Sequence, residues 1–234
     1  MVDFRQRSRM PEYMDDATVV GDDVLAALTE IEYVNRFLGG TRATLHALKH
    51  YLPDARHGAL TLLDIGTGAA DIPIAIVQWA RLHDLDIHLV AVDFNPAICA
   101  LARHNTMAYP EITIQEADVF ALPFDPEAFD IVHSAMFLHH FPQAAAADIL
   151  RIMYACCRQA VIINDLHRHP LAFYSITWLA RWFSRSPMFQ HDAPVSVLRG
   201  FKRPDWEELG QLSGIGHLRI KRRWPYRFVV TASK

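Results

Sequence analysis

Short apolar runs alternate with amphipathic stretches through the middle of the chain. Runs of five to seven residues predict strands near 60–65, 87–93, 112–116, 129–134 and 159–165, and helical spacing predicts helices near 70–83, 96–105 and 142–157. Strands that recur at this interval need right-handed crossovers, which produce a parallel sheet covered by helices on both faces. The pattern therefore predicts an α/β, doubly wound, mostly parallel sheet.

The two ends of the chain add different elements to this centre. Helices over 22–38 and 41–52, separated by Gly39-Gly40, predict an N-terminal helical cap behind a polar, mobile stretch at 1–20. The last third predicts an aromatic helix over 171–183, a polar loop, a helix near 204–212, and strand-like runs at 215–221 and 226–232. The two final runs suit an antiparallel C-terminal edge hairpin.

Composition restricts the class of protein. The chain has 234 residues, 51% of them apolar, and a net charge of −3, so it can build one sizeable core and has no general affinity for nucleic acid or acidic membranes. Three cysteines without C-x-x-C spacing do not form a disulfide framework. The longest apolar stretch, 170–183, is too short to span a bilayer. We expect a cytoplasmic protein, monomeric or homodimeric.

A glycine turn follows the first central strand. The sequence L-L-D-I-G-T-G-A-A-D occupies 62–71, and Asp93 ends the next strand 25 residues after Gly68. This spacing is typical of a nucleotide-binding βαβ unit, in which glycines let backbone approach the ligand and the acid binds ribose hydroxyls. Asp64 and Asp71 would repel a pyrophosphate but attract a cation. S-adenosylmethionine, with its sulfonium and ammonium groups, is the cofactor that fits.

Four ordered motifs carry a family resemblance. They are L-L-D-I-G-T-G at 62–68, A-V-D-F-N at 91–95, E-A-D-V at 116–119 and F-D-I-V-H-S at 129–134. Over roughly 45–165 the chain resembles the class I S-adenosylmethionine-dependent methyltransferases, and Leu138-His139-His140-Phe141 is similar to the ubiquinone/menaquinone-biosynthesis type. The family often has a third glycine where this chain has Ala70.

The resemblance implies a Rossmann-like, seven-stranded sheet in a single domain. Within that domain we expect four segments: a helical cap (1–58), a cofactor-binding core (59–165), an aromatic lid insert (166–203), and a C-terminal helix with the edge hairpin (204–234).

The cofactor residues are expected at the carboxyl ends of the strands. The turn Gly66-Thr67-Gly68 would lie against the methionyl part, with Asp64 and Asp71 near its ammonium, and Asp93 would bind the ribose. By resemblance, Asp118 and the backbone N–H of Val119 would bind adenine; the other cofactor candidates are Phe94 and Ser134. A strand-end aspartate that only caps the next helix is the alternative.

Catalysis by methyl transfer calls for alignment of the two substrates and, for an acidic acceptor, a general base. His140 and His139 are the candidates, and His140 is preferred because its counterpart in the resembling motif is the more recurrent residue. A capping or packing histidine is the alternative. No metal is expected, because the fourth strand ends in Ser134 rather than an acid.

The acceptor is argued mostly by exclusion. The chain lacks the N/D-P-P-Y/F segment of amide or adenine N-methylation, which leaves oxygen or carbon of a small phenolic, quinonoid or polyketide-like molecule. The candidate substrate pocket is Tyr13, Arg36, Phe137, Tyr174 and Trp178.

Three alternatives stay open at this point. The basic positions Arg219, Lys221, Arg222 and Arg223 fit an RNA or protein methyltransferase, although nucleic-acid binding is disfavoured without an RNA-reading motif. A fold relative could bind the cofactor without transferring a methyl group. The aromatic positions 171, 174, 178 and 182 share one helical face, which fits ordinary core packing, a lid, or peripheral contact with a membrane.

Overall fold

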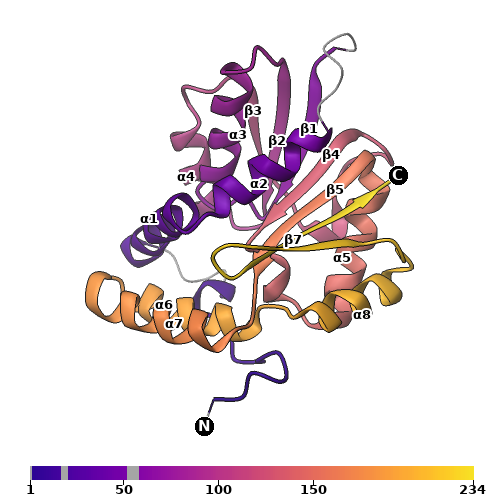
Figure 1. The fold of residues 1–234 in the computed structure, drawn as a ribbon. Coiled ribbons are helices and arrows are strands. Elements are labelled where there is room, and N and C mark those ends of the chain that lie inside the picture. The colour runs from indigo at the N-terminus through magenta and orange to yellow at the C-terminus, as the bar shows by residue number, and fades with distance from the viewer. Residues whose placement is uncertain (1, 17–20, 52–57) are drawn as a thin grey trace.

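The computed structural model describes residues 2–16, 21–51 and 58–234. One seven-stranded sheet has the order β3-β2-β1-β4-β5-β7-β6; β1 to β5 are parallel, and β7 is antiparallel to both β5 and β6 (Figure 1). The strands are β1 (Leu60–Ile65), β2 (Ile87–Asp93), β3 (Ile112–Glu116), β4 (Phe129–Ala135), β5 (Cys157–Leu166), β6 (Arg219–Arg223) and β7 (Arg227–Ser233). The predicted doubly wound sheet and its C-terminal edge hairpin are confirmed.

Helices cover both faces of the sheet. They are α1 (Asp22–Phe37), α2 (Gly40–Leu48), α3 (Asp71–Arg81), α4 (Pro96–Asn105), α5 (Gln143–Cys156), α6 (Pro170–Phe183), α7 (Pro187–Arg199) and α8 (Arg203–Ser213), with 3-10 helices η1 (Tyr13–Asp15), η2 (Lys49–Tyr51), η3 (Val119–Ala121) and η4 (Leu138–His140). Side chains of a strand alternate between faces, so Leu62 packs with α2 and α3 while Leu63 packs with α5 and α8. The core therefore consists of two apolar layers, one on each side of the sheet.

A third group of helices lies beyond the carboxyl ends of the parallel strands (Figure 1). Helices α1, α6 and α7 meet there in a separate apolar cluster that includes Leu28, Ala180, Met188 and Phe189. This cluster is the roof over the end of the sheet where ligands of such folds bind.

Helix α7 corrects the prediction of a polar loop between α6 and α8. Its Ser186 hydroxyl accepts a hydrogen bond from the backbone N–H of Phe189, and Pro187 occupies the first turn. A serine cap followed by proline is a helix start signal. Pro194, inside the helix, and the few apolar positions obscured the helical pattern in the sequence.

The N-terminal segment corrects the prediction of a mobile stretch, as far as residues 2–16 go. Arg7 donates to the backbone oxygens of His139 and Phe141 at 2.9 and 3.0 Å. Buried Arg168 donates to the backbone oxygens of Phe4 and Arg5. The segment is thus fastened across the roof by arginines, which hydrophobic periodicity does not report.

Two further points concern the stretch after α2 and the search for a membrane-spanning helix. The predicted helix end at Leu52 and most of the predicted loop at 53–58 lie outside the described residues. Among the helices that the structure describes, none has the length and apolar character needed to cross a membrane.

Replacing Arg168 tests how much this fastening stabilises the fold. Arg168→Leu removes the bonds to Phe4, Arg5 and Gly200 and takes from Asp205, 2.9 Å away, its charged partner. We expect the free energy of unfolding in urea to fall by about 3 kcal/mol, the scale for breaking a buried charge pair. Arg181→Leu, at an exposed position of α6, is the control and should change it by less than about 0.5 kcal/mol. Equal effects of the two substitutions would show that the fastening is not stabilising.

Candidate functional site

A cavity of about 1000 Å³ opens at the carboxyl ends of the parallel strands. Its floor comes from the residues that follow β1, β2, β3 and β4, and its walls come from α1, α6, α7, η1 and the turn between β6 and β7. The cavity thus lies between the sheet and the roof helices, where the sequence places the cofactor residues.

The glycine turn and Asp93 form one unit on the cavity floor. Gly66 has a φ of +73°, and a β-carbon there would lie 2.3 Å from Cδ2 of Phe137, so only glycine fits. Asp93 Oδ2 accepts from the backbone N–H of Gly68 at 3.2 Å, and its Oδ1 accepts from Asn95 at 3.1 Å. Burial raises the pKa of Asp93 despite these bonds. The carboxylate is therefore held in place at the position predicted for ribose binding.

Asp64 is engaged by a histidine that the sequence did not single out for this role. Its Oδ1 lies 2.6 Å from Nδ1 of His133, and Nε2 of that ring lies 3.1 Å from the Thr44 hydroxyl. All three groups are buried under α2. The ring of His133 thus bridges Asp64 and Thr44. Asp64 still lines the cavity, although its Oδ1 is already bonded to His133.

Asp71 lies at the start of α3 in a chain of polar contacts. Asn35 donates to Asp71 Oδ2 at 3.1 Å and accepts at 3.1 Å from Nη2 of the buried Arg227. Burial raises the pKa of Asp71 to about 6, outweighing the bond from Asn35. Burial also lowers the pKa of Arg227 to about 10, and Asp165 and Asp71 oppose that shift. Arg227 stands in a basic C-terminal stretch, and nothing in the sequence marks it as part of the cavity.

The residues after β3 follow the prediction in position. Asp118 and Val119 line the cavity, as does Phe94 after β2. The Asp118 carboxylate accepts from the backbone N–H of Phe120 at 2.9 Å, so it also caps η3. Capping and ligand binding are compatible here, because a carboxylate has acceptor positions for both.

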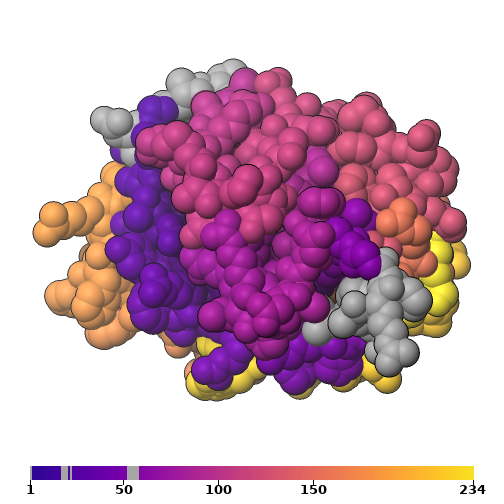
Figure 2. All heavy atoms as spheres, turned by 90° about the horizontal axis from the view of Figure 1, so that it is seen from above, coloured from indigo at the N-terminus to yellow at the C-terminus, as the bar shows by residue number. Residues whose placement is uncertain are grey.

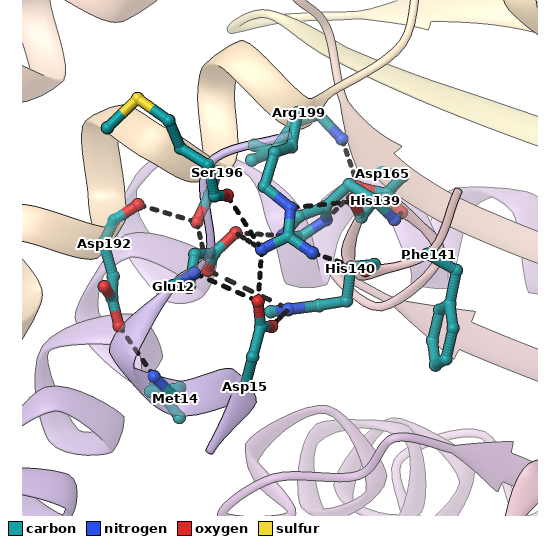
Figure 3. A network of polar contacts seen from close by, with 12 residues as sticks. Glu12, Met14, Asp15, His139, His140, Phe141, Asp165, Asp192, Ser196 and Arg199 are labelled. Carbon is teal, nitrogen blue, oxygen red and sulfur yellow. Dashed lines mark hydrogen bonds and ion pairs between the residues drawn. The ribbon is translucent and has the colours of Figure 1, made fainter. Parts of the chain in front are cut away.

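Both candidate histidines carry a carboxylate on Nδ1 (Figure 3). His139 is buried, and its Nδ1 lies 2.7 Å from Asp165 Oδ1. Burial alone would raise the pKa of Asp165, but His139 holds it below its ordinary value. His140 is partly exposed to the cavity, and its Nδ1 lies 2.7 Å from Asp15 Oδ1.

Arg199 contacts both dyads, as the ion-pair partner of Asp15 in one and through the backbone of His139 in the other (Figure 3). Arg199 donates to Asp15 and to the backbone oxygens of both histidines. Burial alone would raise the pKa of Asp15, but His140 and Arg199 hold it far below its ordinary value. For His140, burial lowers the pKa, and the carboxylates of Glu12 and Asp15 outweigh it, so the net shift is upward.

Glu12 completes this network from the N-terminal segment. Its Oε2 accepts from the Ser196 hydroxyl at 2.7 Å, and its Oε1 lies 3.7 Å from Nε2 of His139. Glu12, His139 and His140 bring potential ligand atoms within 4.8 Å of one another, which could suit a metal ion. The Arg199 guanidinium, 3.5 Å from Glu12, already supplies positive charge there. We assign the cluster to hydrogen bonding rather than to a metal.

The residues predicted for the substrate pocket do not all lie at the cavity. Arg36 and Phe137 line the cavity. Tyr174 and Trp178 do not, because α6 turns them outward and presents Ala172, Ile176 and Leu179 instead.

Two more predictions need correction. Tyr13 points away from the cavity and stacks on His191, while its neighbours Met14 and Asp15 line the wall. The cofactor candidate Ser134 is fully buried and lies outside the lining, which Ala135 continues. The residues that sequence reasoning missed are Glu12, Asp15, Asp165, Arg199 and Arg227.

Comparison with known proteins agrees with this geometry. Residues 62–160 match the methyltransferase domain family. A demethylmenaquinone methyltransferase from Thermus thermophilus is 32% identical over 95 residues, which are 39% of this chain and 41% of that protein. The chain therefore spans about two fifths of the length of the curated relative that it matches.

Solved structures share the fold. A putative S-adenosylmethionine-dependent methyltransferase from Methanococcus maripaludis has a TM-score of 0.63 and 15% identity, covering 92% of this chain and 95% of that one. Magnesium protoporphyrin IX methyltransferase from Synechocystis PCC 6803, with bound S-adenosylhomocysteine, has a TM-score of 0.56 and 16% identity, covering 84% of each chain. The chain thus has the same overall fold as these two proteins.

The raised pKa of Asp71 makes stability depend on pH. The folded pKa of about 6 exceeds the ordinary value of 3.8, so the protonated acid favours folding and this contribution is lost as pH rises from about 4 to about 6. We expect Asp71→Asn to raise the free energy of unfolding by about 2–3 kcal/mol at pH 8, the equivalent of a shift of about two units, and to change it little at pH 4. Asp86→Asn, at an exposed position, is the control in the same urea titrations. A gain independent of pH would contradict this explanation.

Proposed function

We propose that the chain is a class I S-adenosylmethionine-dependent methyltransferase that transfers a methyl group to oxygen or carbon of a small aromatic acceptor, phenolic, quinonoid or polyketide-like; the match of residues 62–160 to the methyltransferase domain family supports this. One observation carries the proposal: a single cavity contains the glycine turn, Asp93 and a histidine–carboxylate dyad. The cofactor supplies an activated methyl group, and the protein's task is to bind, align and exclude water.

The cavity floor suits the cofactor's three parts. Asp93 would accept from the ribose hydroxyls, and the backbone of Gly66 to Gly68 would lie along the methionyl part, where Phe137 leaves no room for a side chain. Asp71 is the carboxylate that would bind the ammonium group of the cofactor. Burial raises the pKa of Asp71, and the positive charge of the ammonium group would offset the cost of ionising this carboxylate. Asp118 and Val119 would hold adenine.

His140 is the general base of the proposal. Its Nδ1–H donates to Asp15, which leaves the Nε2 lone pair available to a proton of the acceptor. Its ring is partly exposed in the cavity, whereas His139 is buried and holds η4 to β5 through Asp165. Asp15 acts as the positioning residue, and Arg199 keeps Asp15 ionised.

The acceptor side of the cavity is apolar. Phe137 and Phe141 form one wall, and the inner face of α6 forms another through Ala172, Ile176 and Leu179. Such a surface suits an aromatic molecule rather than a charged polymer. We propose the four segments of the sequence division as working units, with 59–165 holding the cofactor and 166–203 forming the acceptor wall.

The basic strand is less suited to a catalytic role. Arg219, Lys221 and Arg223 lie on the edge strand β6 and surround a small hollow with His46 and His50, separate from the lining of the large cavity. A polymer held there would not present its reacting atom to the glycine turn. RNA or protein as the acceptor is therefore the weaker alternative, and cofactor binding without turnover on any acceptor would favour a non-methyltransferase.

Calorimetric titration with S-adenosylhomocysteine tests the cofactor placement. Asp93→Ala should weaken its binding by about 1.5–3 kcal/mol, because hydrogen bonds to a charged carboxylate are lost. Glu116→Ala is the matched control: Glu116 pairs with Asp93 across β2 and β3, is exposed, and should leave the affinity unchanged. Unchanged affinity in Asp93→Ala, with the protein folded, would remove Asp93 from the site.

Turnover on a panel of phenols and quinols tests the base. His140→Ala should leave affinity for S-adenosylhomocysteine intact and lower kcat about 100-fold or more. Turnover equal to the unaltered protein would demote His140 to a structural role, and His139 would then be tested in the same way.

The dependence of rate on pH tests the dyad. A base must be unprotonated, so kcat/KM should rise with pH through the raised pKa of His140. Asp15→Asn removes a carboxylate that raises this pKa, and the rising limb should move to lower pH. An acid limb that stays in place in Asp15→Asn would show that another group limits the rate.

A further inference from the structure

Helix α6 presents a row of large apolar side chains to solvent. Leu171, Tyr174, Trp178 and Trp182, spaced by three and four residues, are 59%, 57%, 56% and 69% exposed, and Phe183 next to them is 73% exposed. Their shared face fitted core packing in the sequence, and the structure overturns that interpretation. We call these five residues the aromatic stripe. An exposed apolar patch of this kind marks an interaction surface.

The opposite face of α6 is the wall of the cavity. Ala172, Ile176 and Leu179 contact the cavity, and Ala180 packs in the roof cluster. One helix therefore separates the proposed acceptor pocket from the aromatic stripe. Figure 2 shows the α6–α7 region, in orange, projecting from one side of the molecule, where a flat surface can approach it.

The charge of the segment that carries the stripe is positive, while the nearby Glu30 of α1 accepts from the backbone N–H of Arg185 at 3.3 Å. Residues 167–191 contain no Asp or Glu, and Arg181 and Arg185 are both exposed beside the aromatic positions. Tryptophan, tyrosine and arginine together suit the headgroup level of a bilayer, where amphipathic rings meet apolar chains and cations meet anionic lipids.

The stripe is continuous with the mouth of the cavity. Phe37 and Trp224 line the cavity and are still 70% and 81% exposed, which places them at its opening. The Trp224 ring lies 6.0 Å from that of Tyr226, which stacks at 4.9 Å on His169, the cap of α6. The opening thus lies beside the start of the helix.

From these observations we propose that α6 docks on an anionic bilayer, with the aromatic stripe in the headgroup region and its axis in the membrane plane. A second copy of the chain is a poorer occupant. A two-fold contact through this face would bring a second set of the same arginines to it, and residues 167–191 contain no acid to pair with them; the acid nearby is Glu30 of α1, which accepts from the backbone N–H of Arg185. The proposed docking depends on the features of α6 alone and not on the proposed function.

Docking also narrows the acceptor, and this step rests on the proposed function. A pocket that opens beside a membrane-bound helix would take a lipophilic acceptor from the bilayer without passing it through water. The substrate class would then be a phenol or quinol carrying a hydrocarbon chain.

Flotation with lipid vesicles tests the docking. The full chain is mixed with vesicles of phosphatidylcholine alone or with one third phosphatidylglycerol, and the bound fraction is measured. We expect binding to the anionic vesicles and a loss of about tenfold or more in the partition coefficient of the double variant Trp178→Ser/Trp182→Ser. Leu82→Ser, at an 82% exposed position next to α3, is the matched control and should bind like the unaltered protein. Arg181→Gln/Arg185→Gln should lower the preference for anionic over neutral vesicles.

Three results would overturn the proposal. The first is that the unaltered chain does not bind vesicles, and the second is that the tryptophan double variant binds them equally well. The third is that the unaltered chain forms a dimer in sedimentation velocity but does not bind vesicles, while the double variant is a monomer; this would assign the stripe to self-association. Titration with S-adenosylhomocysteine keeps the two proposals distinguishable: the double variant should retain its affinity, and vesicle binding by a chain that binds no cofactor would uphold docking while refuting the proposed function.

Discussion

Asp64, Asp93 and Asp165 stand at or next to the carboxyl ends of three strands of one sheet, where the fold buries Asp64 and Asp165 and partly buries Asp93. A buried carboxylate without a partner costs several kcal/mol, so each of these acids needs a donor in a fixed place. His133 meets Asp64, His139 meets Asp165, and the backbone of the glycine turn meets Asp93. The segments that carry these donors, β4, η4 and the turn after β1, are held around the cavity by that requirement.

The need of polar groups for hydrogen-bond partners also explains how the N-terminal segment and α7 are held at the site. The turn around η4 exposes backbone oxygens, and Arg7 and Arg199, from opposite ends of the chain, donate to them. Arg199 then needs a counter-charge, which Asp15 provides, and Asp15 in turn holds His140. The proposed base is thus oriented by a residue 125 positions away. The orientation of the proposed base and the fastening of the N-terminal segment therefore depend on one network.

The difference between local sequence patterns and contacts between distant segments explains what the sequence could and could not predict. The sheet, the helices on its faces and the position of Asp93 follow from local patterns, namely apolar runs, helical spacing and a glycine turn. The partners of the buried acids follow from contacts between distant segments, so Asp15, Arg199 and Arg227 carry no periodic signal. Helix α7 was missed because a proline and few apolar positions weakened a pattern that tertiary packing restores.

Helix α6 shows why periodicity alone misplaced its aromatic residues. A helix that is apolar on all sides is normally buried, and the sequence of α6 has apolar residues on both of its faces. Its small side chains face a cavity, which binds a ligand rather than filling with protein, and its large rings face solvent. The proposed aromatic acceptor calls for an apolar wall of small residues on the inner face, so the proposed function leaves the exposed rings unexplained. Their exposure is the basis of the proposed docking on a bilayer, and the absence of acids from 167–191 favours lipids with anionic headgroups.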